Sequence, residues 1–107
     1  MKTYNLSEFH RGWFIGNFDP SILKTDQFEL AVLQHNKGEV WPKHYHAVAT
    51  EYNVLIKGQM TIANQLITPG TIFVIEPNQI ADPIFHEDCT VICFKIPSVP
   101  GDKYELV

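Results

Sequence analysis

The chain has 107 residues, enough for one domain of ordinary size. Its formal net charge is -4 and its 8 Lys and Arg residues are scattered, so no nucleic-acid partner is expected. No apolar run is long enough to span a bilayer, and the N-terminus does not resemble a signal peptide. We therefore expect no membrane partner and a cytoplasmic location.

Short stretches rich in β-branched and aromatic residues follow one another along the chain, with Gly, Pro and Asn turn signals between them. The expected strands, in chain order, are 13–15, 28–35, 51–56, 59–63, 66–68, 71–75, 82–85 and 90–96. No window has a convincing helical period. Short strands at intervals of about 8 to 12 residues are typical of an all-β sandwich or barrel.

Two cysteines, Cys89 and Cys93, lie on the last of these strands. Residues four apart on one strand have Cα atoms about 13 Å apart, which is beyond disulfide reach. The chain has 2 Cys in all, so no further cysteine completes a zinc set. We expect both to be small buried side chains.

Alternation along the strands predicts which side chains face the interior. If Glu51 faces inward, Asn53 and Leu55 do so as well. On the last strand we expect the charged Lys95 to face outward. That choice predicts that the following side chains face inward: Ile92, Phe94 and Ile96. The result would be a mostly apolar pocket with a few polar groups, which is typical of a small-molecule site.

The centre of the sequence carries a potential metal site. His44 and His46 are two residues apart, so in an extended chain both imidazoles point to the same side. Glu51 follows after a turn-length gap and can begin the next strand. Two histidines and one carboxylate form a triad that holds Fe(II) or a similar ion with coordination positions left open. His10 and His35 have no such partners, and both are expected at the surface.

From Gly38 to Gly58 the sequence fits the pattern G-x5-H-x-H-x4-E-x6-G without a gap. This stretch resembles the first conserved motif of the cupin superfamily. The resemblance implies a single cupin-type double-stranded β-helix, a jelly-roll barrel, over residues 1–107. Its core would span about 28–97, with an N-terminal strand segment at about 11–17. It also implies one divalent metal ion (Fe, Mn, Zn or Ni) held by His44, His46 and Glu51.

The second cupin motif, G-x5-P-x-G-x2-H-x3-N, is degraded in this chain. Gly70 and Pro77 are present, but the position of the usual fourth ligand, a histidine, is occupied by Asp82. Three interpretations stay open for Asp82. It can be a metal ligand, a pocket carboxylate that acts as catalytic base or binds substrate, or a turn residue before Pro83. His86 is an alternative fourth ligand.

The resemblance implies a small-molecule ligand and leaves two functions open. One is a metal-dependent enzyme of the dioxygenase, isomerase or lyase type that acts on a sugar or small acid. The other is a non-catalytic module that binds a carbohydrate-like molecule. Fold alone does not choose between them. Small cupins commonly pair, so a homodimer is also expected, with the apolar segment 13–15 available for packing between subunits.

Overall fold

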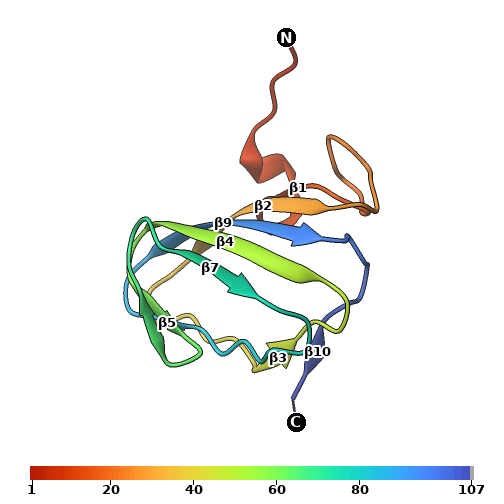
Figure 1. Ribbon diagram of the computed structural model, residues 1–107. Coiled ribbons are helices and arrows are strands. Elements are labelled where there is room, and N and C mark those ends of the chain that lie inside the picture. The colour runs from red at the N-terminus through yellow and green to blue at the C-terminus, as the bar shows by residue number, and fades with distance from the viewer. Residues whose placement is uncertain (107) are drawn as a thin grey trace.

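A computed structural model describes residues 1–106 and is built almost entirely of strands (Figure 1). Two 3-10 turns, η1 (Leu6–Glu8) and η2 (His10–Gly12), come first. The strands that follow are β1 (Trp13–Ile15), β2 (Glu29–His35), β3 (His44–Tyr45), β4 (Thr50–Lys57), β5 (Met60–Ile62), β6 (Gln65–Ile67), β7 (Ile72–Ile75), β8 (Ile84–Phe85), β9 (Cys89–Ile96) and β10 (Tyr104–Glu105). The all-β prediction is confirmed. Within the described residues, no helix is long and apolar enough to cross a membrane.

The strands form one large sheet and two small ones. The large sheet has the order β1-β2-β9-β4-β7, with antiparallel pairing throughout. The small sheets have the orders β6-β5-β8 and β10-β3. Figure 1 shows β5, β3 and β10 on the opposite side of the molecule from β9, β4 and β7. Among residues 1–106 no hydrogen-bonded ladder joins the sheets, so the jelly roll is a pair of facing layers and not a closed barrel.

The core lies between these layers and follows the predicted alternation on β4. Glu51, Asn53 and Leu55 are buried on the inner face, whereas Tyr52 and Ile56 are exposed on the outer face. Leu55 packs in a cluster with apolar side chains from the small sheet β6-β5-β8 and from β9. The inner face of β4 thus carries its polar residues at one end and its apolar residue at the other.

The face prediction for β9 is wrong. Val91 and Cys93 are buried, and Ile92 and Ile96 are exposed. Lys95 lies two residues after Cys93, so it faces the same side of β9, and it lines the interior cavity. The prediction assumed that a lysine must face outward. The alkyl stem of a lysine can instead pack on apolar surface while its ammonium group reaches a polar cavity. This reversal places a positive charge in the pocket.

Candidate functional site

An interior cavity of about 370 Å³ lies between the facing layers. This volume is within the usual range for small-molecule sites. Its apolar walls include Leu33, Met60, Ile62, Phe73, Phe85 and Val91. The cavity is also lined by the predicted residues His44, His46 and Glu51, and by Asn53. The cavity therefore combines apolar walls with a small group of polar side chains, as predicted.

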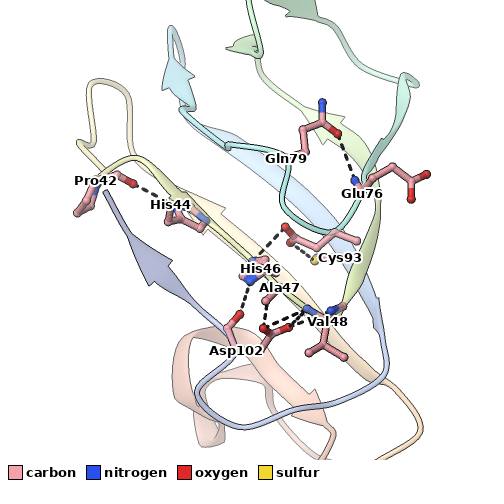
Figure 2. A network of polar contacts seen from close by, with 11 residues as sticks. Pro42, His44, His46, Ala47, Val48, Glu76, Gln79, Cys93 and Asp102 are labelled. Carbon is pink, nitrogen blue, oxygen red and sulfur yellow. Dashed lines mark hydrogen bonds and ion pairs between the residues drawn. The ribbon is translucent and has the colours of Figure 1, made fainter. Parts of the chain in front are cut away.

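His44 and His46 lie side by side at the end of β3, and Glu51 faces them from β4. The two imidazole rings have centroids 5.4 Å apart. His46 is 5% exposed, and its Nε2 atom lies 3.4 Å from Oε2 of Glu51. Figure 2 shows His44 and His46 together with the contacts that hold them. The structure thus brings the three predicted residues to one wall of the cavity.

Hydrogen bonds fix the same tautomer in both histidines. Nδ1 of His44 donates to the backbone carbonyl of Pro42 at 3.0 Å, and Nδ1 of His46 donates to that of Asp102 at 2.6 Å (Figure 2). Because a carbonyl oxygen can only accept, each Nδ1 carries a proton, and in the neutral imidazole Nε2 is then the nitrogen with the free lone pair. Burial lowers the pKa of His46, and the positive charge of Lys95 adds to this effect. His46 is therefore neutral at neutral pH.

Cys93 positions the carboxylate of Glu51. The Cys93 thiol donates from Sγ to Oε1 of Glu51 at 3.1 Å, within a fully buried environment. Burial raises the pKa of this thiol well above its ordinary value, and the negative charge of Glu51 raises it further. Cys93 therefore remains a protonated donor. Both Cys89 and Cys93 are free and buried, as predicted.

The donor chemistry of this group fits a divalent metal. Two imidazole Nε2 atoms with free lone pairs and one carboxylate suit Fe, Mn or Zn. Metal-binding histidines usually donate their other ring N–H to a carbonyl or carboxylate, as His44 and His46 do here. In the described part of the chain, however, no three His, Cys, Asp or Glu side chains stand close enough to hold an ion together. The metal therefore stays a prediction.

Asp82 lies outside this group. Its side chain is 48% exposed, and its Oδ2 atom is 3.9 Å from Nζ of Lys43. The flanking residues Ala81 and Pro83 line the cavity, whereas Asp82 does not. Backbone pairing between Ala81 and His44 sets this orientation, because it turns residue 81 inward and the next residue outward. The structure does not bring the expected fourth ligand or catalytic carboxylate to the cavity.

His86, the alternative fourth ligand, lies elsewhere. It is exposed, and its Nε2 atom is 2.7 Å from Oγ1 of Thr61. His10 is exposed as predicted, although it also lines the mouth of the cavity. Neither histidine joins His44 and His46.

The surface prediction for His35 is wrong. The His35 side chain is only 11% exposed, lines the cavity and stacks on Phe85 with a centroid distance of 4.3 Å. Its Nδ1 atom donates to Oε2 of Glu39 at 2.6 Å, and Nε1 of Trp41 donates to the same oxygen at 2.6 Å. These contacts come from segments on both sides of the turn at Gly38. These contacts fix the orientation of the His35 ring in the cavity wall.

No known family model and no curated protein matches the sequence. Solved structures do match in three dimensions. An uncharacterised protein with a double-stranded β-helix domain from Klebsiella pneumoniae superposes with a TM-score of 0.70 at 15% identity, over 100% of this chain and 98% of that one. DMSP lyase DddQ from Ruegeria pomeroyi gives 0.69 at 12% identity, over 87% and 49%. A sugar phosphate isomerase from a cupin superfamily, from Silicibacter pomeroyi, gives 0.60 at 14% identity, over 75% and 57%.

The chain has the cupin fold. It spans about half the length of the lyase, and all three identities are low, so the likeness concerns the fold alone.

Asp102 is a site residue of this cupin-fold chain that sequence reasoning missed. Its carboxylate accepts hydrogen bonds from the backbone N–H groups of Ala47, Val48 and Ala49, at 2.9 to 3.3 Å (Figure 2). These residues form the loop that joins His46 to Glu51. Burial by itself would raise the pKa of Asp102, but the hydrogen bonds outweigh it and lower the pKa. The ionised carboxylate therefore fixes the spacing between the two candidate ligands.

Three basic side chains at the cavity were also missed. The guanidinium carbon of Arg11 lies 4.1 Å from the ring centroid of Trp41, and Nζ of Lys103 lies 4.5 Å from the same ring centroid. Nζ of Lys95 lies 4.9 Å from the ring centroid of Trp13. All five residues line the cavity. No local pattern marks Arg11 or Lys103, because η2 and the C-terminal segment meet only in the folded chain.

Proposed function

We propose that the protein binds one divalent metal through His44, His46 and Glu51 and acts as an enzyme on a sugar or small acid. The observation that carries the proposal is a pair of neighbouring imidazoles, one of them 3.4 Å from the buried carboxylate of Glu51, on the wall of a small-molecule cavity. Asp82 is not included, because its side chain faces away from the cavity. Three protein ligands would leave coordination positions open for a substrate.

The reaction types best supported are those of an isomerase or a lyase. Structural neighbours that share the fold are named as a sugar phosphate isomerase and as a DMSP lyase. A bound metal would supply a Lewis acid that polarises a carbonyl or hydroxyl oxygen. The chain itself contributes the alignment of that site: Asp102 orients His46, and Cys93 orients Glu51. The apolar walls would surround the uncharged part of a bound ligand with apolar side chains.

A binding module without catalysis is the second candidate. It is favoured by the outward position of Asp82, which removes the expected catalytic base from the cavity. Product formation from candidate sugars and small acids by the metal-loaded protein separates the two functions. Tight binding without product would select the module. Homodimer formation remains a prediction, and a monomeric mass by light scattering at micromolar concentration would contradict it.

The metal proposal is tested by elemental analysis of protein purified without an affinity tag. We expect about one equivalent of Fe, Mn, Zn or Ni per chain in the wild type, and less than about a tenth of that in His44→Ala/His46→Ala, because two of three ligands are removed. His86→Ala is the matched control. It removes an exposed histidine away from the cavity and should keep its metal. Equal metal content in all three proteins, or none in the wild type after supplementation, would refute the proposal.

A further inference from the structure

The charge of the cavity is unbalanced. Apart from histidines, four charged side chains line it: Glu51 and the bases Arg11, Lys95 and Lys103. Within residues 1–106, none of the three bases has a carboxylate oxygen at ion-pair distance. Three positive charges therefore face one cavity with a single carboxylate, and that carboxylate is already engaged by Cys93 and lies near His46.

Two further carboxylates, Glu29 and Glu105, interact with Lys95 and Lys103, but within residues 1–106 they lie outside the cavity lining and form no ion pair with these bases. Glu29 and Glu51 are the cross-strand partners of Lys95 on either side. Burial raises the pKa of Glu29, despite the opposing effect of Lys95. Burial also lowers the pKa of the Lys103 ammonium. The charge of Glu105 opposes this effect, whereas the charges of Lys95 and Arg11 add to it. The bases therefore repel one another in the absence of a ligand.

The bases are nevertheless held in place. Arg11 and Lys103 pack on the ring of Trp41, and Lys95 packs on that of Trp13. Arg11 adopts a left-handed backbone conformation, with φ 53° and ψ 27°, which is unfavourable for a residue with a side chain. Aromatic rings stabilise cations without neutralising them. The arrangement presents positive charge to the cavity at a conformational cost.

A buried side-chain amide without a hydrogen-bond partner also indicates a ligand in the cavity. Asn53 is 5% exposed and lines the cavity, and its Nδ2 atom has no hydrogen-bond partner among the described residues. A buried amide donor without an acceptor is unfavourable, and native proteins rarely leave one unsatisfied. Asn53 lies two residues beyond Glu51 on the inner face of β4. A ligand oxygen in the cavity can accept from it.

We propose that the cavity binds a small organic anion whose carboxylate or phosphate group is held by Arg11, Lys95 and Lys103. Arg11 and Lys103 are exposed, whereas Asn53, Glu51 and His46 are buried. The anionic group therefore sits toward the mouth, and an uncharged oxygen of the same molecule accepts from Asn53 deeper in the cavity. This inference rests on the proposed function only in assigning the ligand to the same cavity. Anion binding by the three bases does not require the metal.

The test uses matched pairs of ligands on the full chain, both as purified and after treatment with a chelator. The pairs are glycerol 3-phosphate against glycerol, and lactate against propane-1,2-diol. Both Trp residues of the chain line the cavity, so their fluorescence reports binding directly. We expect at least one anion to bind about tenfold more tightly than its neutral partner, with or without metal. The preferred anion then distinguishes phosphate from carboxylate recognition.

Variants assign the effect to the bases. Lys95→Gln/Lys103→Gln should weaken anion binding by about tenfold or more and leave the neutral partners unchanged. Lys37→Gln is the control, because it removes the positive charge of a lysine at an exposed turn outside the cavity. Circular dichroism establishes that each variant is folded. Equal binding of charged and neutral partners would overturn the inference, as would unchanged anion binding in Lys95→Gln/Lys103→Gln. Anion binding that disappears with the chelator would place the anion on the metal and also overturn it.

Discussion

Replacing Asp102 by alanine is expected to lower the free energy of unfolding by about 3 kcal/mol, because backbone N–H groups of the His46–Glu51 loop lose their acceptor. Ala49 is buried, so its N–H group would not regain a hydrogen bond from water. Urea unfolding of the variant measures the loss. Asp82→Ala is the matched control, since it removes an exposed carboxylate and should change stability by less than about 0.5 kcal/mol. Equal effects of the two substitutions would contradict this role for Asp102.

The stabilisation that the Asp102 carboxylate provides should disappear in acid. The hydrogen bonds hold the pKa of Asp102 below its ordinary value of 3.8, against the opposing effect of burial. A carboxyl group with a lowered pKa in the folded state stabilises fully above its unfolded pKa, and this contribution is lost as the pH falls through the folded pKa. The stability difference between wild type and Asp102→Ala should therefore be constant near neutral pH and narrow below 3.8. A difference independent of pH would show that the ionised carboxylate is not the stabilising group.

Replacing Gly58 by alanine should destabilise the fold by more than about 2 kcal/mol. Gly58 makes the turn between β4 and β5 with a φ of +94°, and a Cβ atom there would lie 2.3 Å from the carbonyl oxygen of Asp88 and 2.8 Å from Sγ of Cys89. The substitution therefore adds a steric clash with backbone to an unfavourable φ. Thermal unfolding measures the effect.

Gly38→Ala separates these two causes. Gly38 also has a positive φ, +75°, but a Cβ atom there would meet nothing within 4 Å. We expect it to cost about 1 kcal/mol, from backbone strain alone. If both substitutions are equally mild, the close approach at Gly58 does not constrain the fold. The two outer glycines of the cupin-like motif would thus be required for different physical reasons.

Much of the fold could be predicted from local sequence. Runs of β-branched and aromatic residues between turn signals gave every strand longer than two residues, within about two residues at each end. The predicted inner face of β4 was correct because the assignment started from Glu51, which does face inward. The faces of β9 were reversed because Lys95 served as the reference there, and charge alone does not decide whether a lysine faces solvent or a polar cavity.

The candidate site could be predicted only where it is local. His44 and His46 share one short segment, and Glu51 begins the adjacent strand, so spacing was sufficient. Asp82 was placed by counting from Pro77, but its orientation depends on pairing between Ala81 and His44, which spacing does not reveal. Asp102 lies more than fifty residues from the loop it caps. Contacts at such separations leave no periodic signal in a single sequence.

Trp41 lies where η2 and the C-terminal segment approach each other, with Arg11 from η2 and Lys103 from that segment packed on its ring. Two of the three bases proposed to select the ligand are therefore encoded outside the span 28–97 that holds the layered core. Substitution of Arg11 or Lys103 should change ligand preference while the metal motif and the packing of the core remain intact. Divergence within such a scaffold can then proceed through its terminal segments, and directed evolution toward a new ligand should begin with Arg11 and Lys103.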